Sequence, residues 1–256
     1  MVGDYESFKR KVLSLTGIDL GSYKEEQMKR RIDALIIRNN VNSYDSYCSF
    51  IANDKSKFDE FVNYLTINVS EFWRNPEQWK ILEQKILPEF ASKRSIKIWS
   101  AACSTGDEPY SLAMLLKKMN LSATITATDI DKQVLQMAGT GVYNEKSLKG
   151  LPREFLGKYF NKINESPYQI SDEIKRCVSF KQHNLLKDNY VSFCDLIVCR
   201  NVLIYFTEDA KSEIYTKFNK SLNRDGILFL GSTEQIINPQ KYGFTPIASF
   251  FYKKNS

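Results

Sequence analysis

Histidine is nearly absent from this sequence, which has one such residue, His183, among 256. A Ser-His-Asp hydrolase needs a histidine as its general base, and histidine is a frequent ligand of catalytic zinc. A chain with one imidazole is therefore a poor candidate for either class, and we expect no metal site. We interpret His183 as a structural side chain or as one that lies beside a cofactor.

Paired cysteines, long apolar runs and an export signal are also missing. No apolar run approaches the roughly 20 residues that cross a bilayer, and the first residues, MVGDYESFKRK, lack the apolar core of a secretory signal. We therefore expect a cytoplasmic protein without membrane insertion. The cysteines form no Cys-x-x-Cys pair and are odd in number, so we expect reduced, mostly buried thiols. They are Cys48, Cys103, Cys177, Cys194 and Cys199.

The first 70 or so residues have the periodicity of helices. Apolar side chains recur at steps of three and four residues, which places them on one helix face. The segments GIDLGSY and NNVNSY separate these stretches as connectors, and Asn75-Pro76 starts another helix, with Gln78 completing a cap-like spacing. The apolar positions are Tyr5, Phe8, Val12 and Leu15, then Met28, Ile32, Leu35 and Ile36, then Phe58, Phe61, Val62 and Leu65.

From residue 96 the pattern changes to apolar strands that alternate with helices. This alternation predicts a parallel sheet covered on both faces. The final segment, SFFYKK, adds an antiparallel edge strand, and the polar stretch 143–177 predicts an insertion with short helices and a small hairpin. The strands are IKIWSA, TITATD, VSFKQ, DLIVCR and GILFLGS, and the helices are EPYSLAMLLKKM, DKQVLQMAG and EDAKSEIYTKFNKSL.

The turn between the first strand and its helix, AACSTGDE, contains a single glycine and two acids, Asp107 and Glu108. Carboxylates at the positive end of a helix dipole repel phosphate, so this turn does not suit a dinucleotide. A cationic nucleoside without phosphate fits better, and S-adenosylmethionine is such a molecule. Asp129 ends the next strand, where nucleoside-binding sheets place the carboxylate that accepts the ribose hydroxyls. The alternative is that these acids only cap helices.

Five stretches in this order resemble the CheR-type chemoreceptor methyltransferases over nearly the whole chain. Together the five are specific, although CRNVLIYF alone would be a weak signal. They are TINVSEFWRNP (66–76), WSAACSTGDEPYS (99–111), ATDIDKQVL (127–135), HNLL (183–186) and CRNVLIYF (199–206).

The resemblance implies an α/β fold, in which a small N-terminal all-α domain precedes a Rossmann-like S-adenosylmethionine-dependent methyltransferase domain with a small inserted β-subdomain. We expect the helical domain at 1–70, the methyltransferase domain at 71–256 and the insertion at about 155–182. The implied activity is that of a protein-glutamate O-methyltransferase in chemotaxis adaptation. It methylates glutamate side chains on the cytoplasmic methylation helices of chemoreceptors and leaves S-adenosylhomocysteine.

The resemblance also assigns site residues, position by position. Arg74 and Tyr205 orient the incoming carboxylate or the methionine part of the cofactor and are the catalytic candidates. Asp107 is not a matched contact, so we expect it to cap its helix. The positions matched to cofactor contacts are Asn68, Ser70, Arg74, Glu108, Asp129, Asn184, Leu185, Arg200 and Asn201.

Receptor recognition has two sequence expectations. Lys24, Arg31 and Arg38 recur every seven residues and form a basic ridge, either a solvated edge or a surface for an acidic receptor helix. Some family members bind a receptor C-terminal pentapeptide through a glycine-containing turn of the β-subdomain. The stretch NKINESPYQISDEIKRCVSF contains no glycine, so we expect recognition that is independent of the pentapeptide.

Two other functions remain open. The net charge of +6 suits a methyltransferase that acts on nucleic acid, but its aromatic residues lie mostly at apolar-periodic positions, so we expect no nucleic-acid partner. A non-catalytic module that senses S-adenosylmethionine would retain Glu108 and Asp129 but could lose Arg74 and Tyr205, and this chain has all four.

Overall fold

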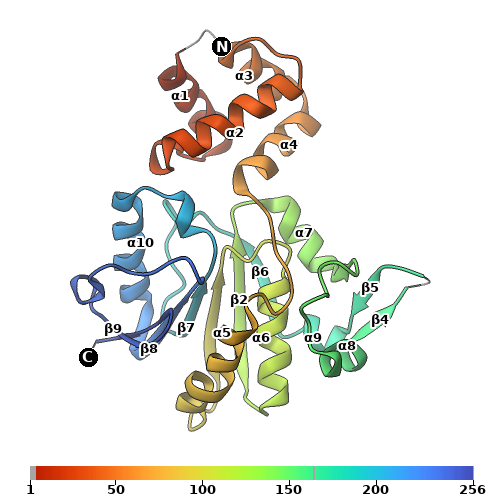
Figure 1. Ribbon diagram of the computed structural model, residues 1–256, viewed down its shortest axis with the longest axis vertical. Coiled ribbons are helices and arrows are strands. Elements are labelled where there is room, and N and C mark those ends of the chain that lie inside the picture. Colours follow the sequence, from red (N-terminus) through yellow and green to blue (C-terminus); the bar gives the residue numbers. More distant parts are fainter. Residues whose placement is uncertain (1–3, 164, 256) are drawn as a thin grey trace. The chain divides into compact units, whose positions relative to one another are not determined.

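The computed structural model describes residues 4–163 and 165–255, which divide into two compact units. The first unit runs to residue 68 and also includes residues 205–211, and the second holds the remainder. Figure 1 shows the course of the chain through both units. No helix within the described residues has the length and apolarity to cross a bilayer.

The first unit is all-helical. Three of its helices begin after a side chain that accepts a backbone N–H, because Asp4, Ser43 and Asp54 act as N-caps. A 3₁₀ turn, η1 (Leu20–Ser22), joins the first two helices. The helices are α1 (Tyr5–Thr16), α2 (Glu25–Arg38), α3 (Tyr44–Asn53) and α4 (Lys55–Thr66).

The predicted apolar faces form most of the core of this unit. All four apolar positions of α2 are buried, and Phe61 and Leu65 of α4 are buried too. Leu15 lies in α1 as predicted but is 38% exposed near the end of this helix. Helix α3 was not predicted, and it buries Tyr44, Tyr47 and Ile51 in the same core.

Residues 205–211 rejoin the first unit through a short backbone pairing. The N–H of Lys24 donates to the carbonyl of Tyr205 over 2.9 Å, and the N–H of Thr207 donates to that of Ser22 over 2.9 Å. The rings of Tyr23 and Phe206 pack with centroids 4.8 Å apart. Helix α10 (Glu208–Ser221) therefore begins in this unit and continues into the second.

The second unit is built on a seven-stranded sheet with the order β6-β2-β1-β7-β8-β10-β9. The first five strands of that order are parallel, and the last two pairings are antiparallel. A parallel sheet was predicted without its strand order, and the bounds of its parallel strands were predicted to within a few residues. The strands are β1 (Ile96–Ala101), β2 (Ala123–Asp129), β6 (Val178–Gln182), β7 (Cys194–Cys199), β8 (Leu222–Leu230), β9 (Phe244–Ala248) and β10 (Phe251–Lys254).

Helices surround this sheet, as Figure 1 shows. Buried apolar side chains of α6 and of the turns before β1 meet those of the central strands in one core. The helices and turns are α5 (Pro76–Ile81), the π turn η2 (Leu82–Ile86), the 3₁₀ turn η3 (Leu87–Phe90), α6 (Asp107–Lys118), α7 (Lys132–Thr140), α8 (Arg153–Tyr159), α9 (Asp172–Lys175), η4 (Leu203–Tyr205) and η5 (Pro239–Tyr242).

The final strand is not at the edge of the sheet, which corrects the sequence prediction. β10 lies between β8 and β9, and β9 forms the edge. β9 contains Pro246, which lacks an N–H for a further ladder, so an edge position suits it.

The predicted insertion contains a second, three-stranded antiparallel sheet of order β3-β5-β4. Its strands are β3 (Val142–Tyr143), which begins one residue before the polar stretch 143–177 and precedes the insertion expected at about 155–182, β4 (Phe160–Lys162) and β5 (Tyr168–Ile170). The domain boundaries that the sequence suggests stay a prediction.

Asp195 holds the amino end of β7 in place through hydrogen bonds to three other residues. Its replacement tests how much these bonds contribute to stability, without any ligand. Its buried carboxylate accepts hydrogen bonds from Lys93 Nζ, Lys97 N and Asn223 Nδ2, each at 2.8 Å. Burial raises its pKa, but these donors outweigh burial and the net pKa is lowered. We expect Asp195→Asn to lower the free energy of unfolding by about 2–3 kcal/mol in urea at pH 7, with the exposed Asp225→Asn as the unchanged control.

The pH dependence of Asp195 follows from the direction of its shift. Its folded pKa lies below the value of about 3.9 in an unfolded chain. The stabilisation is therefore present above about pH 4 and is lost as the pH falls through the folded pKa. The difference in unfolding free energy between the wild type and Asp195→Asn should shrink in acid. A difference that grows there would contradict this account.

Candidate active site

The carboxyl ends of β1, β2, β6, β7 and β8 meet at one edge of the sheet, because these strands are parallel. After β1 the chain makes a tight turn in which Ala102 (φ 62°), Ser104 (φ 49°) and Gly106 (φ 88°) are left-handed. Gly106 stands at the N-cap of α6. A Cβ there would lie 2.9 Å from Ala138 Cβ, so only glycine fits this turn.

Asp107 is buried at the first position of α6. Its Oδ2 accepts a 2.5 Å hydrogen bond from Thr105 Oγ1, while its buried Oδ1 has no partner. The prediction that Asp107 caps α6 was wrong, because Gly106 holds the N-cap position and no side chain makes a cap hydrogen bond there. Burial raises the pKa of Asp107, and hydrogen bonds from Thr105 and Ser70 partly offset this.

Glu108 follows in the same turn and is 13% exposed. Its Oε1 accepts from Ser100 Oγ at 2.8 Å, and its Oε2 pairs with Arg200 Nη1 at 3.4 Å. Burial raises the pKa of Glu108, and the neighbouring Arg200 offsets only part of this rise.

Asp129 ends β2 and is only 6% exposed. Its oxygens accept from the backbone N–H groups of Ser104 at 2.8 Å and Asp131 at 3.0 Å, so it ties the turn after β1 to the turn after β2. Burial raises the pKa of Asp129 to about 6. The carboxylates of Asp107, Glu108 and Asp129 thus concentrate negative charge at this edge.

The turn after β6 joins the same edge. The N–H of His183 donates to the carbonyl of Asp129 over 2.9 Å, and Asn184 Oδ1 accepts from Leu186 N over 2.9 Å to close the turn. Leu185 is 7% exposed. The His183 ring lies against Trp99 and its Nε2 is 3.2 Å from the carbonyl of Asn189, in keeping with a structural imidazole. Burial lowers the pKa of this ring.

Arg200 follows β7 and is almost wholly enclosed, with 2% of its side chain exposed. Its Nη2 donates to the carbonyl of Arg74 at 2.8 Å, to Asn75 Oδ1 at 3.1 Å and to Gln78 Oε1 at 2.7 Å. The guanidinium also lies over the rings of Trp79 and Phe229. Arg200 therefore joins the loop after β7 to the start of α5 and to Glu108.

The segment that leads into α5 is conformationally strained. Trp73 (φ 59°) and Asn75 (φ 61°) are left-handed, which is costly for residues other than glycine. Asn75 occupies the N-cap position as predicted, yet its side chain makes no cap hydrogen bond because it accepts from Arg200 instead. Arg74 is half-buried, and its Nη1 donates to the carbonyl of Val69 over 3.2 Å. Strained residues that cluster at one edge are typical of functional sites.

The structure thus brings eight of the predicted site residues onto one edge of the second unit. Two others, Asn68 and Tyr205, belong to the first unit. The eight are Ser70, Arg74, Glu108, Asp129, Asn184, Leu185, Arg200 and Asn201.

The predicted basic ridge lies in the first unit. Lys24 is exposed at the N-cap of α2, and Arg38 is exposed and pairs with Glu60. Arg31 donates to the carbonyl of Tyr64 at 2.6 Å and lies 4.5 Å above its ring, so this charge is used within the unit.

Sequence reasoning missed three polar residues of this edge. Gln78 and Asn75 were interpreted as helix caps, and Glu234, which is 4% exposed, was not considered. Glu234 lies four residues after the end of β8, so the rule that found Asp129, an acid after a parallel strand, could also have found it.

The residues present fit a cationic nucleoside. Buried carboxylates surround the start of α6, and two buried polar atoms there, Ser104 Oγ and Asp107 Oδ1, have no protein partner. Such a site offers acceptors to ribose hydroxyls and an ammonium, and it disfavours phosphate. Within the part of the chain that the structure describes, no three His, Cys, Asp or Glu side chains gather as metal ligands.

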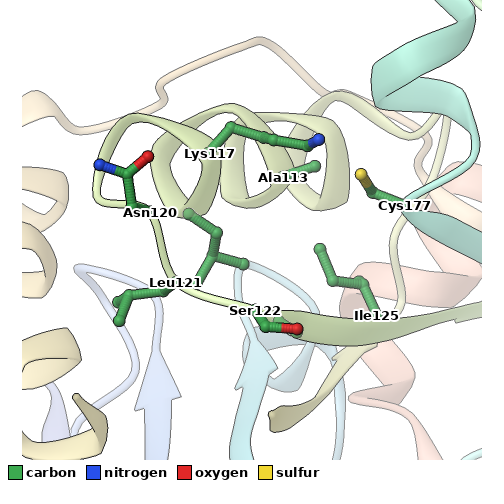
Figure 2. A pocket seen from close by; sticks show the side chains of 9 residues that line it. Ala113, Lys117, Asn120, Leu121, Ser122, Ile125 and Cys177 are labelled. Atoms are coloured by element: carbon green, nitrogen blue, oxygen red, sulfur yellow. The ribbon is translucent and has the colours of Figure 1, made fainter. Parts of the chain in front are cut away.

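A separate pocket of about 430 Å³ lies at the other end of α6. Figure 2 shows Lys117, Leu121, Ile125 and Cys177 around it. Its lining comes from the C-terminal part of α6, the turn that follows it, the amino end of β2 and Cys177, and includes none of the predicted site residues. The candidate chemistry therefore stays at the carboxyl edge.

Comparisons with known proteins agree with this arrangement. Residues 68–251 match the family described as "CheR methyltransferase, SAM binding domain", and residues 3–66 match "CheR methyltransferase, all-alpha domain". The chain is 41% identical over 255 residues to a "Chemotaxis protein methyltransferase" of Listeria monocytogenes, covering 98% of this chain and 97% of that protein. It is 35% identical to "Chemotaxis protein methyltransferase 1" of Vibrio cholerae, covering 91% of this chain and 89% of that protein. It is 32% identical to a "Chemotaxis protein methyltransferase" of Borreliella burgdorferi, covering 93% of this chain and 89% of that protein.

Proposed function

Because the chain belongs to the CheR methyltransferase family, whose domains account for most of its length, we propose that it transfers the methyl group of S-adenosylmethionine to glutamate carboxylates of chemoreceptors. The observation that carries this proposal is the set of buried acids, Glu108 and Asp129 above all, at the carboxyl edge of a parallel sheet. They suit a cationic, phosphate-free nucleoside.

Each residue of the edge has a role in the proposal. Asp129 accepts the ribose hydroxyls, Glu108 takes part in holding the charged methionine end, and Asn184 and Leu185 border the adenine. The family resemblance assigns the remaining cofactor contacts to Asn68, Ser70, Arg74 and Asn201. Arg200 has a guanidinium engaged by protein groups, so we assign it to holding Glu108 and the Arg74 backbone in place.

The chemistry needs no general base. A receptor glutamate is ionised at pH 7 and attacks directly. The bound cofactor supplies an electrophilic methyl group on a sulfonium. Because a carboxylate and a sulfonium become a neutral ester and a neutral thioether, water stabilises the reactants more than the transition state. The residues of the site therefore act by alignment and by exclusion of water, with Arg74 and Tyr205 orienting the carboxylate.

The experiment that tests this function uses methyl-labelled S-adenosylmethionine and a chemoreceptor cytoplasmic fragment. Label that appears on the fragment and is released by mild base identifies a carboxyl ester. Base-stable label on protein, or label on nucleic acid, would overturn the proposal. A matched fragment with glutamine at the candidate glutamates is the control.

Receptor recognition is proposed to use exposed basic residues, namely Lys24 and Arg38 beside an acidic receptor helix, while Arg31 has a structural role. We also propose that the pentapeptide is not needed. A receptor fragment shortened by its last five or so residues should then be methylated at the rate of the full fragment, and a much lower rate would contradict this.

Tyr205 gives a direct prediction for the reaction. Tyr205→Phe should lower kcat by about 10–100-fold, the loss of one hydrogen bond to a charged group, because the hydroxyl orients the attacking carboxylate. The Kd for S-adenosylmethionine should change little, as calorimetry would show. The half-buried Tyr242→Phe serves as the control, and an unchanged kcat would remove Tyr205 from the mechanism.

A further inference from the structure

Glu234 is a buried acid whose carboxylate is surrounded by backbone donors. Oε2 accepts from Asn201 N at 2.6 Å and from Gly231 N at 2.9 Å. Oε1 accepts from Leu203 N at 2.7 Å and from Ile204 N at 3.3 Å. Burial raises the pKa of this carboxyl, while the four N–H groups lower it. One side chain thus satisfies most of the backbone donors in the loop after β7.

The local backbone is shaped to receive this carboxylate. Asn201 is left-handed (φ 62°), and this conformation turns its N–H toward the same point as those of Leu203 and Ile204. Convergent N–H groups of this kind form an anion-binding nest. A Cβ on Gly231 would lie 2.5 Å from Glu234 Oε2 and 2.8 Å from Asn201 N, so glycine is needed for the close approach. The chain therefore fills its own anion nest.

We propose that Glu234 is a positioning residue for methyl transfer. Its carboxylate fixes the backbone of residues 201–204 and thereby the orientation of the residues before and after them in the sequence, Arg200 and Tyr205. This inference rests on the proposed function. On one side of the loop Arg200 reaches Glu108 and the start of α5. On the other side Ile204 leads directly to Tyr205. Glu234 thus acts through the loop and not by contact with a substrate.

The isosteric variant Glu234→Gln separates this role from simple space filling. An amide has one oxygen, and each oxygen of Glu234 serves two N–H groups, so either orientation of the amide loses two of the four bonds. We expect kcat with a receptor fragment to fall about 20-fold or more, since misplacement by about 1 Å can cost 100-fold. The Kd for S-adenosylmethionine should rise by less than kcat falls, because Asn201 is one cofactor contact among several and Glu108 and Asp129 lie on other turns.

Glu234→Ala adds a readout that a merely structural role would not give. The deleted atoms correspond to acetate, so added acetate should restore kcat in a saturable way, whereas acetamide should not, and Glu234→Gln should not respond. Amide hydrogen exchange at residues 201, 203 and 204 should be faster in both variants and slow again in Glu234→Ala with acetate. Glu89→Gln, the same change at an exposed acid, is the matched control.

Three results would overturn the proposal. They are wild-type kcat in Glu234→Gln, loss of cofactor affinity in step with kcat in both variants, or acetate that restores the unfolding temperature but not kcat. The proposed function fails separately, because it fails when the wild-type protein places no base-labile methyl on the receptor fragment.

Discussion

Replacing Arg200 by methionine is expected to lower the free energy of unfolding by about 3–5 kcal/mol, as when one partner of a buried ion pair is removed. The substitution keeps the apolar packing on Trp79 and Phe229 but removes every donor of the guanidinium. Glu108 then remains buried without its counter-charge, and Gln78 Oε1 loses a 2.7 Å hydrogen bond. Urea unfolding followed by circular dichroism measures the change.

Arg224 provides the matched control for this experiment. Its side chain is 81% exposed and its nearest acid, Asp225, lies at the 4.0 Å limit of an ion pair. Arg224→Met should therefore change the unfolding free energy by no more than about 0.5 kcal/mol. If Arg200→Met lost as little, the network around Arg200 would have no role in stability.

A double-mutant cycle shows whether the loss in Arg200→Met comes from the orphaned acid. Glu108→Gln removes the charge that Arg200 compensates, so the double variant should lose less than the sum of the two single variants, by about 0.5–3 kcal/mol. Strict additivity would mean that the contacts to the Arg74 carbonyl, Asn75 and Gln78 carry the whole effect.

Arg200 also shows what the sequence could and could not predict. The apolar pattern predicted the strand that Arg200 ends, and the family resemblance placed this residue near the cofactor. The partners of its guanidinium did not, because Asn75 and Gln78 lie 125 and 122 residues away along the chain. Viewed locally, these residues had the spacing of a helix cap. Local patterns thus locate a side chain, whereas long-range pairing decides its role.

The antiparallel end of the sheet was mispredicted for a related reason. The segment FTPIA of β9 is short and contains a proline, so it does not stand out as a strand. Only its pairing with β10 reveals it. The position of Glu234 after a parallel strand could have drawn attention to it, but its role could not be predicted, because the four backbone N–H groups that donate to it leave no trace in side-chain patterns.

Asp129→Asn is expected to weaken S-adenosylmethionine binding by about 100-fold, since each hydrogen bond to a charged group contributes about 1.5–3 kcal/mol and tenfold in Kd is 1.4 kcal/mol. In the wild type the N–H groups of Ser104 and Asp131 donate to the carboxylate, and the amide of the variant would place an NH₂ group against one of them. Calorimetry at pH 7.5 or so measures the effect. Asp131→Asn is the neighbouring control, because that carboxylate accepts from Gln133 N to cap α7.

The pH dependence of binding gives the same residue a second, independent test. Burial raises the pKa of Asp129 to about 6, so its acceptor form is lost on acidification and affinity should fall up to about tenfold per unit below that pH. Folding responds with the opposite sign. The folded pKa exceeds the unfolded value of about 3.9, so the contribution of Asp129 to stability is greatest below that value and is lost as the pH rises through 6 or so. Affinity that is flat between pH 7.5 and 5 or so would show that the ligand does not engage this carboxylate.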